Sequence, residues 1–355
     1  SQQYVRLRGE FEDYLTDPYT PSVERNPVTD HVTFAFIGAG FAGLLAGARL
    51  KEAGVEDVRI IDKAGDFGGT WYWNRYPGAM CDTASLVYMP LLEETGYMPT
   101  EKYAHGPEIW EHCRRIARQY GLYENALFHT SVTSLSWDET GCCWRIGTDR
   151  GDFFTAQFVG IGLGPLNLAK LPRLPGIRSF HGHAFHTSRW DYAYTGGTPE
   201  GSPLDKLTDK RVAIIGTGAT AVQCVPEVAK TARELYVFQR TPSSIDARDN
   251  GPIDPEWFRT IATPGWQRRW IENFTLNWEG VSGLISEEIE DLVQDGWTDL
   301  GRRMRAALAD VPREGLTPER LQEAYEAADF AKMDAIRSRV DALVDDPATA
   351  PNLKA

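Results

Sequence analysis

Two glycine-rich turns in this chain have the residue types that bind the phosphates of a dinucleotide. The first turn follows a β-rich run over residues 31–37. Its glycines, spaced G-x-G-x-x-G, are Gly38, Gly40 and Gly43. The first glycine permits a tight turn, the second lets the backbone approach a pyrophosphate, and the third lets the following helix pack on the strand. Free N–H groups at the start of that helix then favour the phosphates. A glycine motif alone also suits a tight turn without a ligand, but the flanking strand and helix favour dinucleotide binding.

A second turn repeats this arrangement later in the chain. Residues 211–215 are an apolar run that predicts a strand, and the letters G-T-G-A-T-A follow directly. Alanine in the third motif position is an accepted variant, because a small side chain still lets the helix approach the strand. The residues predicted to bind a nucleotide at this turn are Gly216, Thr217, Gly218, Ala219, Thr220 and Ala221.

The residue that ends the second strand differs between the two sites. Asp62 lies 22 residues after Gly40 (62 − 40), and Arg240 lies 22 residues after Gly218 (240 − 218), with Thr241 beside it. A carboxylate accepts hydrogen bonds from ribose hydroxyls, whereas a guanidinium binds a ribose 2′-phosphate through charge-assisted bonds. The two sites are therefore predicted to bind different nucleotides, with NADPH at the second. The alternative is that Arg240 is only a solvated strand end.

The composition narrows the class of protein. The 355 residues carry a net charge of −13, which argues against nucleic acid as a partner because its phosphates need a basic face. The five cysteines include no C-x-x-C pair, so we expect reduced thiols in the cytoplasm and not a disulfide reductase. No run of about 18 apolar residues and no signal-peptide pattern occurs, so we expect no membrane association. No metal-ligand spacing is present either.

A third pattern lies between the two turns. It reads F-x-G-x-x-x-H-x-x-x-W-D, and its fixed residues are Phe180, Gly182, His186, Trp190 and Asp191. This segment resembles the signature of type I Baeyer–Villiger monooxygenases. The resemblance implies an enzyme that uses FAD, NADPH and O2 to convert a ketone into an ester or lactone through a flavin peroxide. The spacing of His186 and Trp190 would also suit two packing partners on one helix.

The resemblance assigns FAD to the first turn and NADPH to the second. Asp82 matches an acid that lies close to the flavin and orients a catalytic arginine, although a surface turn or cap residue is the alternative. The family has arginine where this chain has Met80. The residues implied to bind FAD are Gly38, Gly40, Phe41, Gly43, Asp62, Lys63, Gly69, Thr70, Trp71, Trp73, Asp82, Tyr88 and Val132. Those implied to bind NADP are Met80, Cys81, Asp82, the six residues of the second turn, Arg240 and Thr241.

These patterns predict an α/β fold with two Rossmann-like domains, an antiparallel insert and a helical region. The predicted domains are an N-terminal extension (1–30), the first segment of the FAD-binding domain (31–175), and an NADP-binding domain (176–355) with a helical insertion (256–345). Five tryptophans between 257 and 297 either fill a core or line a substrate entrance. The predicted strands of the insert lie near residues 131–137, 144–148 and 153–161.

The chain ends at Ala355 before any segment that matches the part of the family that completes the FAD domain. In the family the catalytic arginine lies early in that part. We therefore expect a fragment, a cleaved chain or further residues beyond Ala355. A missing C-terminal segment or a complementary chain would then be a partner.

Two other functions remain as alternatives. One is a flavin-dependent monooxygenase acting on nitrogen or sulfur, against which Trp190 and Asp191 argue, because such enzymes generally carry a different aromatic residue there. The other is a non-catalytic nucleotide-binding fragment that serves redox sensing or assembly. The sequence does not identify the ketone, although the tryptophan-rich region is typical of a bulky, lipophilic substrate.

Overall fold

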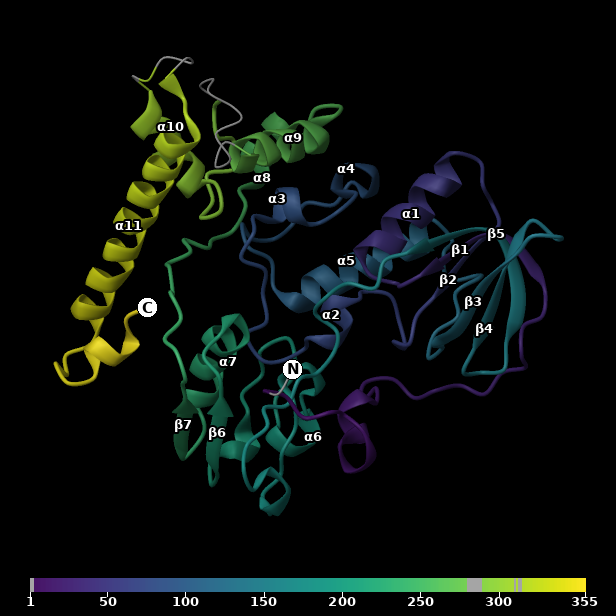
Figure 1. The fold of residues 1–355 in the computed structure, drawn as a ribbon, viewed down its shortest axis with the longest axis horizontal. Coiled ribbons are helices and arrows are strands. Elements are labelled where there is room, and N and C mark those ends of the chain that lie inside the picture. The colour runs from purple at the N-terminus through teal and green to yellow at the C-terminus, as the bar shows by residue number, and fades with distance from the viewer. Residues whose placement is uncertain (1–2, 280–288, 310, 312–314) are drawn as a thin grey trace. The chain divides into compact units, whose positions relative to one another are not determined.

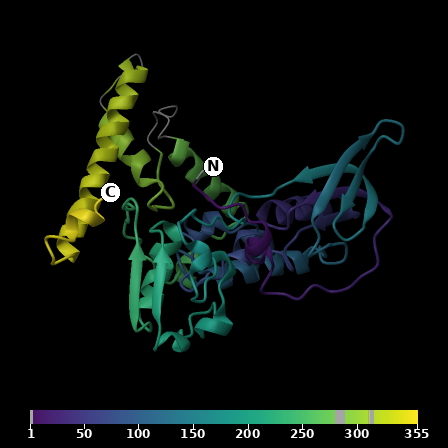
Figure 2. The same ribbon diagram turned by 60° about the horizontal axis from the view of Figure 1, so that its bottom comes forward.

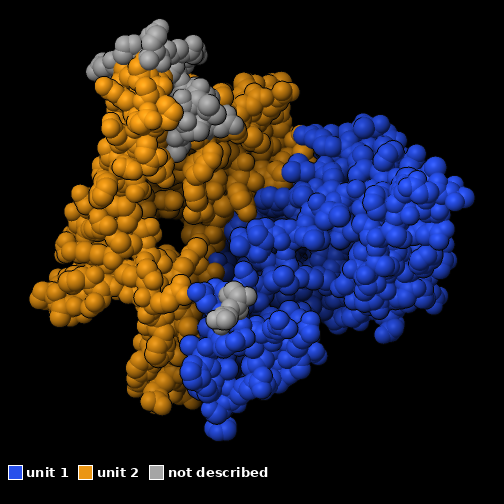
Figure 3. All heavy atoms as spheres, viewed as in Figure 1, with its two compact units in different colours: residues 1–79, 105–207 blue, residues 80–104, 208–355 orange. Residues whose placement is uncertain are grey.

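The computed structural model describes residues 3–279, 289–309, 311 and 315–355. The chain forms two compact units, coloured separately in Figure 3. Unit 1 comprises Ser1–Ala79 and His105–Leu207, and unit 2 comprises Met80–Ala104 and Thr208–Ala355. Each unit is described by itself below. These units are defined by contacts within the chain. The boundaries of the FAD- and NADP-binding domains at residues 31–175 and 176–355 therefore stay a prediction.

Unit 1 is built on a mixed five-stranded sheet with the order β2-β1-β5-β4-β3 (Figures 1 and 2). Parallel pairing joins β1 to both β2 and β5, whereas β4 is antiparallel to both β3 and β5. The long strand β5 therefore belongs both to the parallel sheet and to the antiparallel insert, whereas the sequence predicts only its place in the insert. The strands are β1 (His31–Ile37), β2 (Val58–Ile61), β3 (Val132–Asp138), β4 (Cys143–Thr148) and β5 (Phe153–Ile161).

Two longer helices of unit 1 pack against one another, α1 (Phe41–Glu52) and α5 (Gly106–Gln119). In α5 the buried apolar residues Ile109, Cys113 and Ile116 recur every three or four positions, so one face of the helix points into the core. The other short elements of unit 1 are η1 (Gly9–Leu15), α2 (Thr70–Trp73), η2 (Ile177–Ser179), η3 (Thr187–Arg189), α6 (Tyr192–Thr195) and η4 (Asp205–Leu207).

Unit 2 has a two-stranded parallel sheet and a set of helices. The second glycine turn connects β6 to α7, and β7 pairs with β6 in register from Arg211 opposite Glu234 to Ile215 opposite Phe238. These elements are as the sequence predicts. Unit 2 contains β6 (Arg211–Ile215), β7 (Glu234–Phe238), α3 (Ser85–Tyr88), α4 (Leu92–Thr95), α7 (Ala219–Ala229), α8 (Pro255–Ile261), α9 (Trp266–Glu279), α10 (Asp299–Leu308), α11 (Pro318–Leu343) and η7 (Ala350–Leu353).

Residues 80–104 join unit 2 through buried hydrogen bonds from the later part of the chain. The Gln267 side chain, on α9, accepts from the Leu92 backbone N–H (2.7 Å) and donates to the Met89 carbonyl (2.7 Å). The Asp295 carboxylate accepts from the Ala84 N–H (3.1 Å). Satisfying these backbone groups inside the protein avoids the cost of burying them unpaired.

The tryptophans of the helical region divide between core and surface. Trp266 and Trp270 are buried, whereas Trp257, Trp278 and Trp297 are 42%, 45% and 38% exposed. Only two of the five therefore act as core residues in unit 2. None of the helices in the described ranges is long and apolar enough to cross a membrane.

Close backbone packing in unit 1 explains two of the glycines in the first turn. Gly38 has a φ of +117°, and a Cβ there would overlap the carbonyl of Gly162, which follows β5. A Cβ at Gly43 would overlap the carbonyl of Gly38, so α1 lies directly on the turn. These contacts are those that the first and third motif glycines are expected to permit.

Replacing Gly38 with alanine should destabilise the protein more than an ordinary positive-φ substitution. Gly54→Ala is the matched control, because Gly54 has a φ of +85° but nothing within 4 Å of an added Cβ. We expect Gly54→Ala to lower the free energy of unfolding by about 1–2 kcal/mol, and Gly38→Ala to lower it by at least about 2 kcal/mol more because backbone must move. Urea unfolding measures both values. Equal losses would contradict the packing argument.

Candidate functional site

The first glycine turn meets the aromatic segment that follows β2. Gly69 has a φ of +53°, and a Cβ there would lie 2.7 Å from the Cα of Gly40. The Gly68 N–H also donates to the Ala39 carbonyl (3.0 Å). The structure thus brings Gly40 and Gly69, two of the predicted FAD residues, into backbone contact. Thr70 begins α2 beside them.

The side chains of α2 point mainly into unit 1. Trp71 is 8% exposed and Trp73 is 2% exposed, so both serve as core residues of the segment. Phe41, the first residue of α1, and Thr70 are only partly buried. The turn at this edge of the sheet therefore offers backbone groups and small side chains, while the large rings of α2 support it from within.

Asp62, which follows β2, holds the first turn in shape. Its carboxylate accepts hydrogen bonds from the backbone N–H groups of Ala39 (2.6 Å) and Ala64 (2.8 Å). Burial raises the pKa of this carboxyl group, and the two N–H donors oppose that rise. Each carboxylate oxygen keeps a second lone pair, so the Asp62 carboxylate can still accept the predicted hydrogen bond from a ribose hydroxyl.

Two other predicted FAD residues, Lys63 and Val132, lie close to the end of β2. Lys63 donates to the Asn167 side chain (2.7 Å) and lies 5.7 Å from the centre of a Trp73 ring. Burial lowers the pKa of its ammonium group. Val132, the first residue of β3, packs against the core cluster that includes Ile61. Val132 is thus fixed close to the end of β2, where an adenine-facing residue is predicted.

His186 of the signature is an N-cap and does not belong to the same helix as Trp190. Its Nδ1 accepts from the Ser188 N–H (3.1 Å) and lies 2.8 Å from the Ser188 hydroxyl oxygen. Burial, with a smaller contribution from the Arg189 charge, lowers the pKa of His186 to about 4. The imidazole is therefore neutral near pH 7 with its proton on Nε2. Helical packing of His186 with Trp190, the alternative considered from the sequence, is wrong because η3 spans only Thr187–Arg189.

Trp190 and Asp191 organise the turn that ends the signature. Trp190 is 5% exposed and its indole N–H donates to the Thr195 hydroxyl (3.1 Å). The Asp191 carboxylate caps α6 by accepting from the Tyr194 N–H (3.0 Å) and lies 2.8 Å from Nε2 of His183. The His183 ring stacks on Tyr194 with 4.0 Å between centroids. Sequence analysis missed His183, although its spacing from Asp191 is a visible signal.

The first two signature residues lie on the surface of unit 1. Phe180 is 65% exposed, and its ring packs over Gly182, where a Cβ would overlap it. Arg189, a variable position in the signature, is buried and its guanidinium lies 3.8 Å from the centre of a Trp73 ring. Cation–π contact of this kind stabilises the association of the two segments. The signature and α2 therefore pack together within one unit.

In unit 2 the second glycine turn has the predicted form. Gly216 has a φ of +110°, and its N–H donates to the Phe238 carbonyl (2.8 Å). Gly218 precedes α7 in extended conformation, and Ala221 is buried on that helix. Thr217 donates its hydroxyl to the Thr241 carbonyl (3.3 Å). The turn and the end of β7 are thus held together.

Arg240 and Met80 lie near this second turn. Arg240 is exposed after β7, and among the described residues no acid forms an ion pair with it, so its guanidinium can bind an anion. Both backbone groups of Met80 bond to the side chain of Gln223 on α7, at 3.3 Å through its N–H and 2.9 Å through its carbonyl. Sequence analysis did not identify Gln223, because no motif marks that helix position.

Three predicted residues of unit 2 remain: Asp82, which contacts Arg248, and Cys81 and Tyr88. Asp82 has a 55% exposed side chain, 3.8 Å from the Arg248 guanidinium, which also donates to the Asp82 carbonyl (3.4 Å). Cys81 is buried, and this burial raises the pKa of its thiol to about 12, so the thiol is neutral. Tyr88 ends α3 and is half-buried. Arg248 is a third residue that sequence analysis missed.

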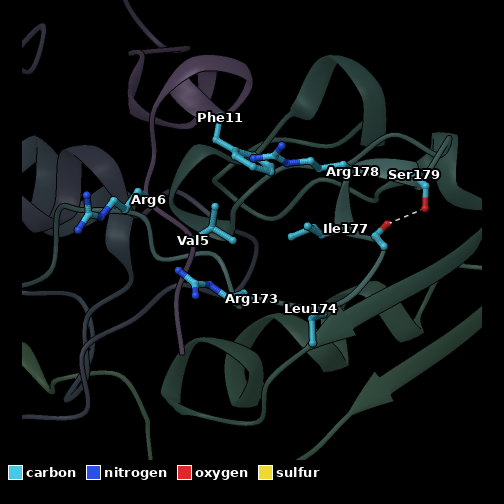
Figure 4. Close-up of a pocket in the computed structure, with 9 residues that line it drawn as sticks. Val5, Arg6, Phe11, Arg173, Leu174, Ile177, Arg178 and Ser179 are labelled. Atoms are coloured by element: carbon cyan, nitrogen blue, oxygen red, sulfur yellow. Dashed lines mark hydrogen bonds between the residues drawn. The ribbon is translucent and has the colours of Figure 1, made fainter. Parts of the chain in front are cut away.

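A shallow pocket of about 590 Å³ in unit 1 is lined by none of the predicted site residues (Figure 4). It is bounded by the N-terminal segment and residues 173–179, with Arg6, Arg173 and Arg178 around apolar side chains. Arg178 forms an ion pair with Glu10 (2.6 Å). The pocket does not adjoin the first turn in sequence, and the site described above does not use it.

The fold and the first turn define a Rossmann-type dinucleotide-binding protein. A family described as "NAD(P)-binding Rossmann-like domain" matches residues 37–96. Among characterised relatives, neopentalenolactone D synthase of Streptomyces avermitilis is 53% identical, over 99% of this chain and 58% of that protein. A Baeyer–Villiger monooxygenase of Streptomyces coelicolor is 50% identical, over 100% of this chain and 58% of that protein.

Solved structures agree with these relatives. Polycyclic ketone monooxygenase from Thermothelomyces thermophila has a TM-score of 0.89 at 40% identity, over 99% of this chain and 59% of that chain. OTEMO, solved in complex with FAD and NADP, has a TM-score of 0.67 at 28% identity, over 91% of this chain and 60% of that chain. The chain spans about three-fifths of the length of these relatives. The predicted α/β fold and the resemblance to Baeyer–Villiger monooxygenases are confirmed.

The neutral state of His186 predicts a pH-dependent stability. An unfolded imidazole has a pKa near 6.5 and His186 in the folded chain has one of about 4, so the unfolded state binds the proton first as the pH falls. His186 should leave stability unchanged above about pH 6.5. Between about pH 6.5 and 4 it should lower the free energy of unfolding by up to roughly 3 kcal/mol.

Urea unfolding at several pH values tests this expectation. The His186→Gln variant should lose that part of the slope, whereas His181→Gln, at an exposed position of the same segment, should keep it. A wild-type slope that persists in His186→Gln would mean that another group titrates.

Proposed function

We propose that the protein containing this chain is a Baeyer–Villiger monooxygenase that converts a ketone into an ester or lactone with O2, FAD and NADPH. The observation that carries the proposal is the complete signature from Phe180 to Asp191, packed against α2 beside the first turn. The names of the relatives support it, since they include Baeyer–Villiger monooxygenase and polycyclic ketone monooxygenase. A bulky, alicyclic ketone is the proposed substrate class.

The residues of the first turn fit FAD. Gly40 and Gly69 lie in backbone contact with no side chain between them. Without side chains at these positions, backbone N–H groups at the start of α1 can approach a pyrophosphate. Asp62, already oriented by two N–H donors, would accept from the ribose. The family match over residues 37–96 names NAD(P). We assign FAD to this turn because the resemblance to Baeyer–Villiger monooxygenases places it there, and the negative charge of Asp62 disfavours the 2′-phosphate of NADPH. Bound FAD would supply the activation of oxygen.

The second turn fits NADPH. The exposed guanidinium of Arg240 and the Thr241 hydroxyl would bind the 2′-phosphate, and Gly216 to Ala221 would face the pyrophosphate. Met80 is tied to this turn through Gln223, in support of the proposed NADP contact. Asp82 is proposed to orient a catalytic arginine that has no counterpart among residues 1–355. The Arg248 guanidinium holds the backbone and the carboxylate of Asp82 in unit 2.

A cytoplasmic location is also proposed. All five cysteines are free thiols, which suits a reducing compartment. The charge of −13 disfavours nucleic acid as a partner. The proposed partners are O2, a small-molecule ketone, and the part of the relatives' length that this chain does not span.

Turnover by the full-length protein tests the proposed reaction. We expect NADPH oxidation that accelerates when alicyclic or polycyclic ketones are added, with one ester or lactone formed for each NADPH in a coupled reaction. Amines and sulfides in the same panel test the nitrogen- and sulfur-oxidising alternative. Bound FAD with no oxygenated product from any ketone would overturn the proposal.

Arg240→Ala should change the preference between the two nicotinamide cofactors. Losing a charge-assisted contact to a phosphate costs about 1.5–3 kcal/mol, so KM for NADPH should rise roughly 10- to 100-fold while KM for NADH changes little. Arg233→Ala is the matched control, because Arg233 is an exposed arginine just before β7. Equal effects of Arg240→Ala on both cofactors would contradict the assignment of the 2′-phosphate.

A further inference from the structure

Residues 16–20, which we name the N-terminal clasp, connect the signature to the aromatic segment of the first site. Tyr19 makes the link with a single atom. Its hydroxyl donates to the Trp73 carbonyl at the end of α2 (3.3 Å) and accepts from the Trp190 N–H in the signature (3.0 Å). One side chain from a third part of the sequence therefore satisfies backbone groups of both segments.

Asp17 fixes the clasp to the loop before α2. Its side chain is only 7% exposed, and its carboxylate accepts from the Tyr72 hydroxyl and from the Gly65 N–H (3.1 Å). The same carboxylate group receives the Tyr19 N–H (2.9 Å). A buried carboxylate without partners would be costly, so these donors determine where the clasp lies. The Thr20 hydroxyl also bonds to Tyr72.

Two arginines complete the connection between the segments. Arg75 lies among aromatic rings, 4.3 Å from the centre of Tyr19 and 3.9 Å from that of a Trp110 ring, and its carbonyl accepts from the Tyr192 hydroxyl (2.6 Å). Arg189, which packs on α2, donates from Nε to the Thr16 carbonyl (3.0 Å). The clasp thus contacts both segments at each of its ends.

We propose that the N-terminal clasp is a positioning element that holds α2 and Gly69 in the conformation that binds FAD and couples them to the signature. The effect of the clasp on catalysis rests on the proposed function, whereas the contacts of the clasp are seen directly in the structure. Directional bonds to backbone groups restrict orientation more than apolar packing does. Movement of the signature segment would therefore reach the FAD turn through Tyr19, which is a positioning residue and touches no reacting atom.

The test compares Tyr19→Phe with Tyr120→Phe in the full-length protein. Both variants remove one hydroxyl and keep the ring, but the Tyr120 hydroxyl bonds to the exposed Glu52 (2.7 Å), away from the clasp. Hydrogen exchange should report at least a tenfold faster exchange of the Trp190 amide in Tyr19→Phe only. The dissociation constant of FAD should rise about tenfold, and more hydrogen peroxide should form per NADPH consumed.

Three outcomes would overturn the proposal. An unchanged Trp190 amide would contradict the contact itself. The role would be merely structural if exchange became faster while FAD affinity and peroxide yield stayed unchanged. The same conclusion would follow if only the melting temperature fell. Asp17→Asn should change the same quantities in the same direction, and it decides the result if Tyr19→Phe does not fold. A wild-type protein that binds FAD but oxygenates no ketone would defeat the proposed function and leave the exchange and affinity comparisons valid.

Discussion

Main chain packs directly against main chain at the end of β1, and the first unit is arranged around this contact. Gly38 meets the backbone after β5, while Gly40 meets Gly69 from the segment after β2. Side chains at these positions would separate the turn, the sheet and the aromatic segment. Asp62 adds hydrogen bonds that hold the turn in the same place. The proposed phosphate binding would need backbone N–H groups at this point, so packing and the proposed binding depend on the same absence of side chains.

The signature contributes little reactive chemistry of its own in this structure. His186 is neutral and caps a turn, Trp190 is buried, and Asp191 caps α6. Each residue type suits a structural bond of this kind, and together they place Arg189 against Trp73. A segment that identifies a family can therefore act by holding two other segments together.

Local patterns in the sequence predict the strands, the two turns and the acid or arginine after each second strand, because periodicity and motif spacing act over short distances. Contacts between distant residues are beyond such patterns. Asp17 and Tyr72 are 55 residues apart, and no periodicity joins them. The position of residues 80–104 in unit 2 depends on Gln267. The sequence does not mark this residue as buried, because polar residues of a helix usually face solvent. Arg248 was missed because it lies 166 residues from Asp82 and meets it only after folding.

The insertion of residues 80–104 into unit 2 also affects how the chain is made. Leu92 precedes its partner Gln267 by 175 residues, which at roughly 5–20 residues per second corresponds to roughly 10–35 s of synthesis. During that time Met89 and Leu92, fully buried in the finished protein, have left the ribosome without the helix that covers them. Unit 1 can close around the gap between Ala79 and His105 earlier. The apolar side chains of this segment are therefore covered only after α9 has been synthesised.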